Sequence, residues 1–261
     1  MRQPSPKKSL GQHWLHDERS LEAMAAAADV RPGDTVLEIG PGLGTLTAAL
    51  LGHGAKVVAV EFDRELAKAL PGRLNHENLS VIEHDILSFD FTRLPAGYKV
   101  AANIPYYLTS NLLRVLCESD NPFASAALLT QKEVAERVAA APGDMSLLSV
   151  SVQFYCEVGL GPVVPAELFT PPPKVDSQIL MLQYRPKPLF PDADKKEFFR
   201  LVKAGFSERR KKLRSSLSGG LGLSKPEAES LLHKAGIDPS LRAQELSLDD
   251  WYRLWQSVYN T

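Results

Sequence analysis

Short apolar runs alternate with segments of helical periodicity along the first half of the chain. An apolar run bounded by turn residues is typical of a strand buried on both faces, and apolar residues spaced three and four apart are typical of an amphipathic helix. The pattern predicts strands at 35–40, 56–63, 79–87, 98–107 and 124–131, and helices at 17–29, 45–54, 64–74, 108–119 and 132–140. Such alternation requires crossover connections, so we expect an α/β fold with a mainly parallel sheet and helices on both faces.

The pattern changes after residue 140. Residues 146–158 and 177–186 are two strand-like runs, and the stretch between them, 169–176, is rich in proline instead of helical. Two strands joined without a helix predict an antiparallel pair, which would complete a sheet of seven strands.

The last part of the chain contains only segments of helical pattern. They follow a proline-rich stretch at 185–194, which we interpret as a linker, and they lie at 195–206, 207–217, 224–236 and 247–259. We therefore predict two domains, a larger α/β domain over 1–186 and a small all-helical domain over 187–261.

Charge is distributed unevenly between these two parts. The whole chain has 30 Lys and Arg against 31 Asp and Glu, but residues 187–261 carry 14 against 10, a net charge of +4, and the residues before them carry −5. The positive charge is densest in one cluster: Arg209, Arg210, Lys211, Lys212 and Arg214. Such a cluster can neutralise phosphates, although a charged run is as often the solvated face of a helix.

Composition excludes several classes of protein. No apolar run is long enough to span a bilayer. The N-terminal arm carries Arg2, Lys7 and Lys8 but lacks the apolar core of a signal peptide, so we expect a cytoplasmic protein without membrane contact.

Neither a disulfide nor a metal site is expected. Cys117 and Cys156 are far apart and show no C-x-x-C spacing. His13 and His16 have helical spacing, but no carboxylate or thiol accompanies them, as a metal site would require.

Glycines follow the first predicted strand, at the edge where an open parallel sheet binds its ligands. Gly40, Gly42 and Gly44 would let a ligand approach the backbone, or would serve only a tight turn. The dinucleotide fingerprint G-x-G-x-x-G would place glycine at position 45, where the chain has Thr45. A nicotinamide-linked oxidoreductase is therefore not favoured.

Acidic residues end the next two strands. Glu61 lies 17 residues after Gly44, a spacing at which a carboxylate meets the hydroxyl groups of a bound ribose. Asp63 is more ordinary and is expected to cap the next helix. Asp85 is placed to accept a hydrogen bond from an adenine amino group, with Ile86 covering the ring, so these strand ends are expected to bind a nucleoside-containing cofactor.

Four segments, taken in order, resemble the signatures of one family. They are SLGQHWLHD (9–17), NIPYYLTS (103–110), FTPPPKVDS (169–177) and RAQELSLDDW (242–251). Together with the glycine series and the two strand-end acids, they resemble the KsgA (RsmA) family of ribosomal RNA adenine dimethyltransferases. The resemblance extends from about residue 7 to the C-terminus, and it implies a Rossmann-like fold that uses S-adenosyl-L-methionine, followed by a helical RNA-binding domain.

The resemblance also implies a role for the aromatic stretch 103–107. The Asn103 side-chain oxygen and the Pro105 carbonyl would hold the amino group of a target adenine, so that its lone pair faces the methyl donor and no strong base is required. Tyr106 and Phe169 would stack on the two faces of that adenine after it leaves the RNA stack. Tyr107 is expected to pack inward.

The N-terminal segment GQHWL resembles the family's G-Q-N-F-L, which closes over the methionine part of the cofactor. His13 stands where the family has Asn, and Trp14 replaces Phe and keeps the aromatic wall. The residues expected to bind the cofactor are Gln12, His13, Leu15, Gly40, Gly42, Gly44, Glu61, Asp85, Ile86 and Asn103.

The function implied by the resemblance is N6,N6-dimethylation of two adjacent adenosines in a hairpin near the 3′ end of small-subunit (16S) rRNA. The expected partner is this rRNA in a partly assembled ribosomal subunit, and the expected enzyme is a monomer. Two alternatives remain. An Erm-like enzyme, which shares the N-x-P-Y chemistry, would methylate large-subunit rRNA instead. A non-catalytic RNA-binding assembly factor would keep the same fold without turnover.

Overall fold

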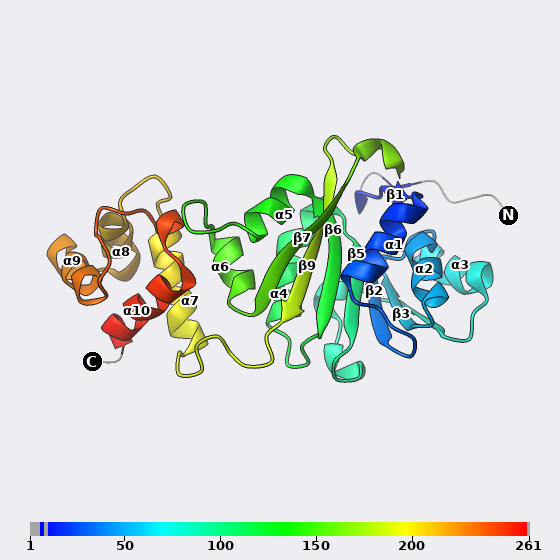
Figure 1. Ribbon diagram of the computed structural model, residues 1–261, viewed down its shortest axis with the longest axis horizontal. Coiled ribbons are helices and arrows are strands. Elements are labelled where there is room, and N and C mark those ends of the chain that lie inside the picture. Colours follow the sequence, from blue (N-terminus) through cyan, green and yellow to red (C-terminus); the bar gives the residue numbers. More distant parts are fainter. Residues whose placement is uncertain (1–5, 8–9, 260–261) are drawn as a thin grey trace. The chain divides into compact units, whose positions relative to one another are not determined.

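The computed structural model describes residues 6–7 and 10–259, which form two compact units (Figure 1). The first unit contains the chain up to Glu136 and then Cys156–Tyr184, and the second contains Arg137–Tyr155 and the chain from Arg185 onward. The chain therefore enters the second unit twice. Residues 137–155, assigned from the sequence to the first domain, belong to the helical unit by their packing.

The first unit is built on a seven-stranded sheet with the order β4-β3-β2-β5-β6-β9-β7. The strands from β4 to β6 in this order are parallel, and β9 is antiparallel to both neighbours, which confirms the predicted mainly parallel sheet. The strands are β2 (Thr35–Ile39), β3 (Lys56–Glu61), β4 (Leu79–Glu83), β5 (Lys99–Asn103), β6 (Ser125–Gln131), β7 (Cys156–Val164) and β9 (Ser177–Tyr184). Two short strands, β1 (Trp14–Leu15) and β8 (Phe169–Thr170), pair separately.

Helices cover both faces of this sheet (Figure 1). The helices α1 (Glu18–Ala27), α2 (Thr45–Gly52) and α3 (Arg64–Leu74) share one apolar cluster with one face of the strands, and Ala101 of β5 belongs to it. Val100 and Ala102 are buried outside this cluster, because successive side chains of a strand point to opposite faces. In Figure 1, α4 (Thr109–Cys117) lies behind the sheet, on that second face. Burial on both faces explains why the strands are nearly continuous apolar runs.

The order of the strands determines where a ligand can bind. From β2 the chain continues to β3 and β4 on one side, and then returns to β5 and β6 on the other side of β2. The loops that follow β2 and β5 therefore leave the sheet in opposite directions and open a crevice at the carboxyl ends of these strands.

The second unit is helical, and aromatic rings form its core. Its helices are α6 (Leu147–Gln153), α7 (Lys195–Phe206), α8 (Leu213–Leu221), α9 (Lys225–Lys234) and α10 (Leu248–Tyr259), and α5 (Lys132–Val138) crosses into it from the first unit. Phe154 packs against Phe190 and Phe198 with ring centroids 6.0 and 4.8 Å apart. Phe190 in turn stacks on Tyr252 of α10 at 4.3 Å. These contacts explain why residues 137–155 belong to this unit, and they show that the stretch 185–194, interpreted as a linker, is packed against the helices.

Two predicted elements were wrong. Residues 146–158, predicted as one strand, contain the helix α6 and the first residues of β7, because Ser146 forms a capping box with Ser149 and begins a helix there. Residues 207–212 form a turn instead of continuing a helix, because the Ser207 amide and hydroxyl both bond to the Ala204 carbonyl and end α7. The cationic cluster therefore begins on a turn.

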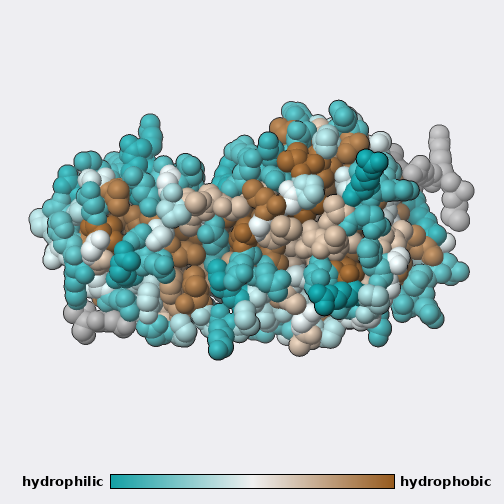
Figure 2. Space-filling model, viewed as in Figure 1, coloured by the Kyte–Doolittle hydropathy of each residue, from teal (hydrophilic) through white to brown (hydrophobic). Residues whose placement is uncertain are grey.

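The strand β7 forms one edge of the sheet. Leu160 and Val163 are exposed on it, and Figure 2 shows hydrophobic surface over this part of the first unit. The register with β9 shifts between these two residues, where Pro162 lies. A bulge with proline blunts an exposed edge because it removes a donor that another strand could pair with.

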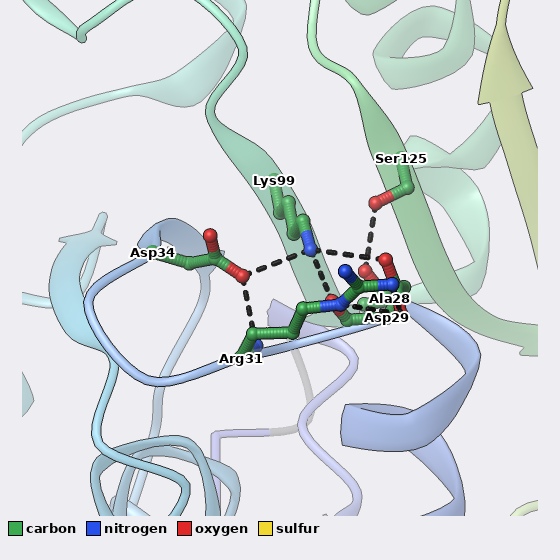
Figure 3. A network of polar contacts seen from close by, with 6 residues as sticks. All are labelled: Ala28, Asp29, Arg31, Asp34, Lys99 and Ser125. Carbon is green, nitrogen blue, oxygen red and sulfur yellow. Dashed lines mark hydrogen bonds and ion pairs between the residues drawn. The ribbon is translucent and has the colours of Figure 1, made fainter.

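A polar network lies at the end of the sheet where the central strands β2, β5 and β6 begin (Figure 3). The Lys99 ammonium lies 2.8 Å from the Asp34 carboxylate and 3.3 Å from that of Asp29, and it also donates to the Asp29 carbonyl. The Arg31 amide donates to Asp34, and the Ser125 hydroxyl donates to the end of α1. The turn between α1 and β2 is thereby attached to β5 and β6.

Replacing Lys99 with Met should lower the free energy of unfolding by about 1–3 kcal/mol at neutral pH, because Lys99 is only 9% exposed and its removal leaves Asp34 without a cation and Asp29 with Arg31 alone. Burial alone would raise the pKa of Asp34, but Lys99 and the Arg31 amide bring it below its usual value. Arg31 and Lys99 also lower the pKa of Asp29. A lowered carboxylate pKa stabilises the folded state above about pH 5, and this contribution is lost below about pH 4.

Urea unfolding at several pH values measures this effect. The difference between Lys99→Met and the wild type should shrink as the pH falls below about 4. The matched control is Lys56→Met, which removes an exposed lysine from the start of β3. Equal losses in both variants would show that the network adds nothing.

Candidate functional site

The carboxyl ends of β2, β3, β4 and β5 surround a cavity of about 240 Å³ in the first unit. The N-terminal segment from Leu10 to Leu15 also lines it. The predicted site residues that line the cavity are Gln12, His13, Leu15, Gly40, Gly42, Glu61, Asp85, Ile86, Asn103, Pro105, Tyr106 and Phe169. The structure therefore brings together in one place residues that the sequence analysis took from separate segments.

The loop after β2 uses its glycines in different ways. Gly40, Gly42 and Gly44 have φ angles of 66°, 57° and 87°, a region that disfavours other residues. A Cβ atom on Gly40 would meet nothing within 4 Å, so this backbone is open where it lines the cavity. Gly44 does not line the cavity: a Cβ atom there would lie 2.5 Å from Leu70 Cδ1 of α3. The structure gives Gly44 a packing role, between α2 and α3.

The carboxylate of Glu61 lies at the end of β3 and is 6% exposed. One oxygen accepts from the Gly42 amide at 3.1 Å and the other from the Asp63 amide at 2.8 Å. Burial raises the pKa of Glu61, and the two amides oppose this shift. Because a carboxylate can accept about four hydrogen bonds, both oxygens can still accept hydroxyl groups. Asp63 caps α3 through the Glu65 amide, as predicted.

The lining residues that the sequence analysis did not single out include Phe62 and Glu38. Phe62 follows Glu61 and is 64% exposed. Glu38 lies within β2, and burial raises its pKa to about 8, with a further increase from nearby Glu61. Its Oε2 atom has no hydrogen-bond partner among residues 6–7 and 10–259. The available signal was a glutamate inside an otherwise apolar strand.

Asp85 follows β4, and one of its oxygens accepts from the Leu87 amide at 2.9 Å, which begins a short turn, Ile86–Ser88. In the part of the chain that the structure describes, the second oxygen has no partner, so it remains available to a donor. Ile86 is buried and lines the cavity beside it.

The amide of Asn103 is oriented by the N-terminal segment. Its Nδ2 donates to the His13 carbonyl at 2.9 Å. A carbonyl oxygen only accepts hydrogen bonds, so the NH₂ group must face it and the Oδ1 atom must face away. The Pro105 carbonyl accepts from the Leu108 amide at 2.9 Å, which leaves it one further lone pair. The carbonyl that orients Asn103 belongs to the backbone, so it is present whichever side chain residue 13 has.

The His13 side chain joins two other parts of the site. Its Nδ1 atom lies 2.6 Å from the Pro171 carbonyl and must therefore donate to it. Its ring stacks near Tyr106 with centroids 6.1 Å apart. His13 thus links the N-terminal segment to the loop that carries Phe169.

The neighbouring tyrosines point in different directions. Tyr106 is half-buried, and its hydroxyl lies 2.9 Å from the Ser177 hydroxyl. Burial raises the pKa of Tyr106. The prediction that Tyr107 packs inward was wrong, because its side chain is 66% exposed. The two residues belong to one 3₁₀ turn, Tyr106–Leu108, in which consecutive side chains diverge by about 120°.

The N-terminal segment is attached on both sides of the cavity. Lys7 forms ion pairs with Asp63 at 2.9 Å and Glu65 at 3.0 Å, and its amide donates to the Gln12 side chain. The Thr45 hydroxyl donates to the Leu15 carbonyl at 2.9 Å. The other predicted cations of this arm, Arg2 and Lys8, lie outside the described residues.

The parallel sheet, the glycine loop and the polar side chains at successive strand ends define the Rossmann-like class of S-adenosylmethionine-dependent methyltransferases. The chain belongs to the ribosomal RNA adenine dimethylase family, whose sequence model matches residues 4–259, and it is an rRNA adenine dimethyltransferase.

Curated relatives extend over nearly the whole chain. Ribosomal RNA small subunit methyltransferase A of Dehalococcoides mccartyi (strain CBDB1) is 43% identical over 95% of this chain and 87% of its own length. The protein of that name from Moorella thermoacetica is 42% identical over 94% of this chain and 90% of its own length.

Solved structures share the fold of both units. The 23S rRNA methyltransferase ErmE is similar with a TM-score of 0.75 and 29% identity, over 94% of this chain and 98% of that one. A dimethyladenosine transferase from Plasmodium falciparum is similar with a TM-score of 0.78 and 28% identity, over 93% and 96%.

Membrane-spanning helices and metal clusters are both absent from the described residues. No helix in this part of the chain is long and apolar enough to cross a membrane. Within the same residues, no group of three or more His, Cys, Asp or Glu side chains is placed to hold a metal ion.

Replacing Gly44 with Ala should lower the free energy of unfolding by about 1–3 kcal/mol, because the new methyl group collides with Leu70, which is fully buried. The matched control is Gly40→Ala, which has the same kind of backbone strain but no neighbour within 4 Å. Urea unfolding should therefore show a larger loss for Gly44→Ala than for Gly40→Ala. The opposite order would mean that packing against α3 does not require this glycine.

Proposed function

We propose that this protein transfers methyl groups to the N6 atoms of two adjacent adenosines in a hairpin near the 3′ end of small-subunit (16S) rRNA, within a partly assembled subunit. The relatives that are 41–43% identical over nearly the whole chain carry the name of a small-subunit methyltransferase, which supports this substrate. We further propose that it acts as a cytoplasmic monomer.

The observation that carries the proposal is the orientation of Asn103. Its NH₂ group is held by the His13 carbonyl, so its Oδ1 atom remains as an acceptor in a side chain that lines the cavity. The exocyclic amine of adenine presents two N–H donors, and its nitrogen is a poor nucleophile because the lone pair is delocalised into the ring. Two acceptors, Asn103 Oδ1 and the Pro105 carbonyl, suit such a donor.

The cavity fits S-adenosylmethionine. Bound there, this cofactor supplies an activated methyl group on a positively charged sulfur. Glu38 and Glu61 bring two buried carboxyl groups to the wall, and Glu38 Oε2 has no partner among the described residues, so a cationic ligand would compensate for burying them. Glu61 would accept from the ribose hydroxyls, and Asp85 from the adenine amino group of the cofactor.

The protein's own residues then position the target amine. Tyr106 and Phe169 would stack on the two faces of the adenine, which offsets the cost of taking it out of the RNA stack by about 1–3 kcal/mol per base. Asn103 and Pro105 would hold the two N–H bonds and direct the lone pair towards the methyl group. Methyl transfer would leave a positive charge on the nitrogen, which would then release its proton to solvent, so positioning and electrostatics would carry most of the catalysis.

An Erm-like activity on large-subunit rRNA is the nearest alternative, because the structure of ErmE resembles this chain over almost its whole length. Purified small and large subunits lacking these methyl groups, incubated with tritiated S-adenosylmethionine, distinguish the two substrates. We expect label in the small subunit only, as N6,N6-dimethyladenosine. Label confined to the large subunit would overturn the proposal.

Replacing Asn103 with Ala should reduce methyl transfer by at least about 100-fold while leaving cofactor affinity within a few-fold of the wild type, because the amide acts on the target amine. Tritium transfer and calorimetry with S-adenosylmethionine measure the two quantities. Asn111→Ala, which changes an exposed asparagine of α4, is the matched control. Equal loss of both quantities in Asn103→Ala would make the residue structural, and failure of the wild type to bind the cofactor would favour a non-catalytic assembly factor.

The helical unit is proposed to bind the rRNA backbone through its cationic turn. Arg209, Arg210 and Lys212 are exposed and form no ion pair within the described residues. Lys211 pairs with Glu208 and Arg214 pairs with Glu229, so these two cations are partly neutralised. The first three are therefore the stronger candidates for contact with phosphates.

Replacing Arg209, Arg210 and Lys212 together with Ala should weaken RNA binding and reduce the slope of log affinity against log salt by about 0.7 to 0.9 for each phosphate that the protein no longer neutralises. The matched control replaces three other exposed lysines of the helical unit, Lys196, Lys225 and Lys234, and so changes the net charge equally. Filter binding at several salt concentrations measures the slope. If both triple variants reduce it equally, the effect is one of net charge and not of this turn.

A further inference from the structure

Exposed aromatic rings are concentrated at the cavity. Among the Phe, Tyr and Trp side chains of the described residues, only Phe62 and Tyr107 are exposed, by 64% and 66%. Both line the cavity. A single exposed aromatic residue is ordinary on a protein surface. Two that both lie at one site, while all the others are buried or half-buried, indicate a surface that contacts a ligand.

The two rings belong to different sides of the site. Phe62 follows Glu61 at the end of β3, beside the carboxylate proposed to bind the cofactor ribose. Tyr107 lies on the turn that follows β5, beside Tyr106 and beyond Asn103, where the target amine is proposed to be held. Tyr107 is therefore on the substrate side.

The ring of Tyr107 is supported on one side and open on the rest. A Cβ atom on Gly11 would lie 3.5 Å from Tyr107 Cε1, so the backbone of the N-terminal segment runs along the edge of the ring. Tyr106, the preceding residue, is held by Ser177, and the geometry of the 3₁₀ turn directs Tyr107 away from it. Tyr106 is proposed to stack on the target base. The ring of Tyr107 points away from Tyr106, so it can contact a different base.

We propose that Tyr107 stacks on the base that flanks the target adenosine, an inference that rests on the proposed function. When the target leaves its stack, the flanking base loses a stacking partner, and an aromatic ring at the mouth of the cavity replaces it. If two adjacent adenosines are methylated, each is the flanking base of the other, but on the 3′ side of the first and on the 5′ side of the second. A ring in one position reaches only one of these sides, so it contacts the partner adenosine when one particular member of the pair is the target.

Small subunits reconstituted on transcribed rRNA, which carries no methyl groups, allow a direct test. Tyr107→Ala should lower kcat/KM for methyl transfer by about 5- to 150-fold, the equivalent of about 1–3 kcal/mol for one stacked base, with the affinity for S-adenosylmethionine unchanged. Tyr107→Phe keeps the ring, so its kcat/KM for methyl transfer should fall by less than about threefold. Leu160→Ala, which removes an exposed apolar side chain away from the cavity, is the matched control.

A second substrate separates stacking from other roles of the ring. It is made in two forms, in which either the 5′ or the 3′ adenosine is replaced by uridine, which stacks less strongly, and methylation of the remaining adenosine is measured in each. On one of the two forms the rate of methylation by the wild type should fall several-fold, and the rate of Tyr107→Ala, which is already lowered, should fall little further. If the wild type and Tyr107→Ala lose the same factor on both forms, Tyr107 does not contact the flanking base and the inference is wrong.

Three further outcomes also decide the matter. If Tyr107→Ala loses cofactor affinity in proportion to activity, the ring supports only the N-terminal segment, and the inference fails. If the wild type methylates the small subunit and Tyr107→Ala does so equally well, the inference alone fails. If the wild type does not methylate this subunit, the proposed function fails, and the inference falls with it.

Discussion

The hydrogen bond from Asn103 to the His13 carbonyl is the interaction on which the site depends. It joins the end of β5 to the N-terminal segment, and it settles which end of the amide is left for a ligand. The side chain of His13 extends the same link to Pro171, so the parts of the chain that carry Asn103, Tyr106 and Phe169 are held together through one residue. A reaction that relies on positioning rather than on a strong base requires such fixed partners.

The sheet supplies the frame for this arrangement. Because the winding reverses at β2 and β5, the ends of four neighbouring parallel strands open on one crevice, and each contributes residues that line the cavity. The opposite ends of β2, β5 and β6, where these strands begin, are held together by Lys99 and its two carboxylates (Figure 3).

The sequence was sufficient for the mainly parallel sheet and for bringing most of the predicted site residues to one place, because the carboxyl ends of parallel strands meet at one edge whatever the loops do. It was insufficient where tertiary contacts decide between helix and strand, or decide which way a residue faces. The apolar run at 146–158 suits a helix or a strand, and Ser146 with Ser149 makes its first part a helix. A glycine series cannot reveal that Gly44 accommodates Leu70 while Gly40 faces the cavity, and two adjacent tyrosines cannot reveal which is exposed. The role of each site residue stays a prediction, since geometry places side chains and does not measure what they bind.

A crystal structure of the protein with S-adenosylhomocysteine and an RNA hairpin that carries the two adenosines tests the central claim most directly. We expect the target N6 atom within about 3.2 Å of Asn103 Oδ1 and within hydrogen-bonding distance of the Pro105 carbonyl, with Asn103 Nδ2 still donating to His13. An amide turned the other way, or an adenine amine held by different groups, would contradict it.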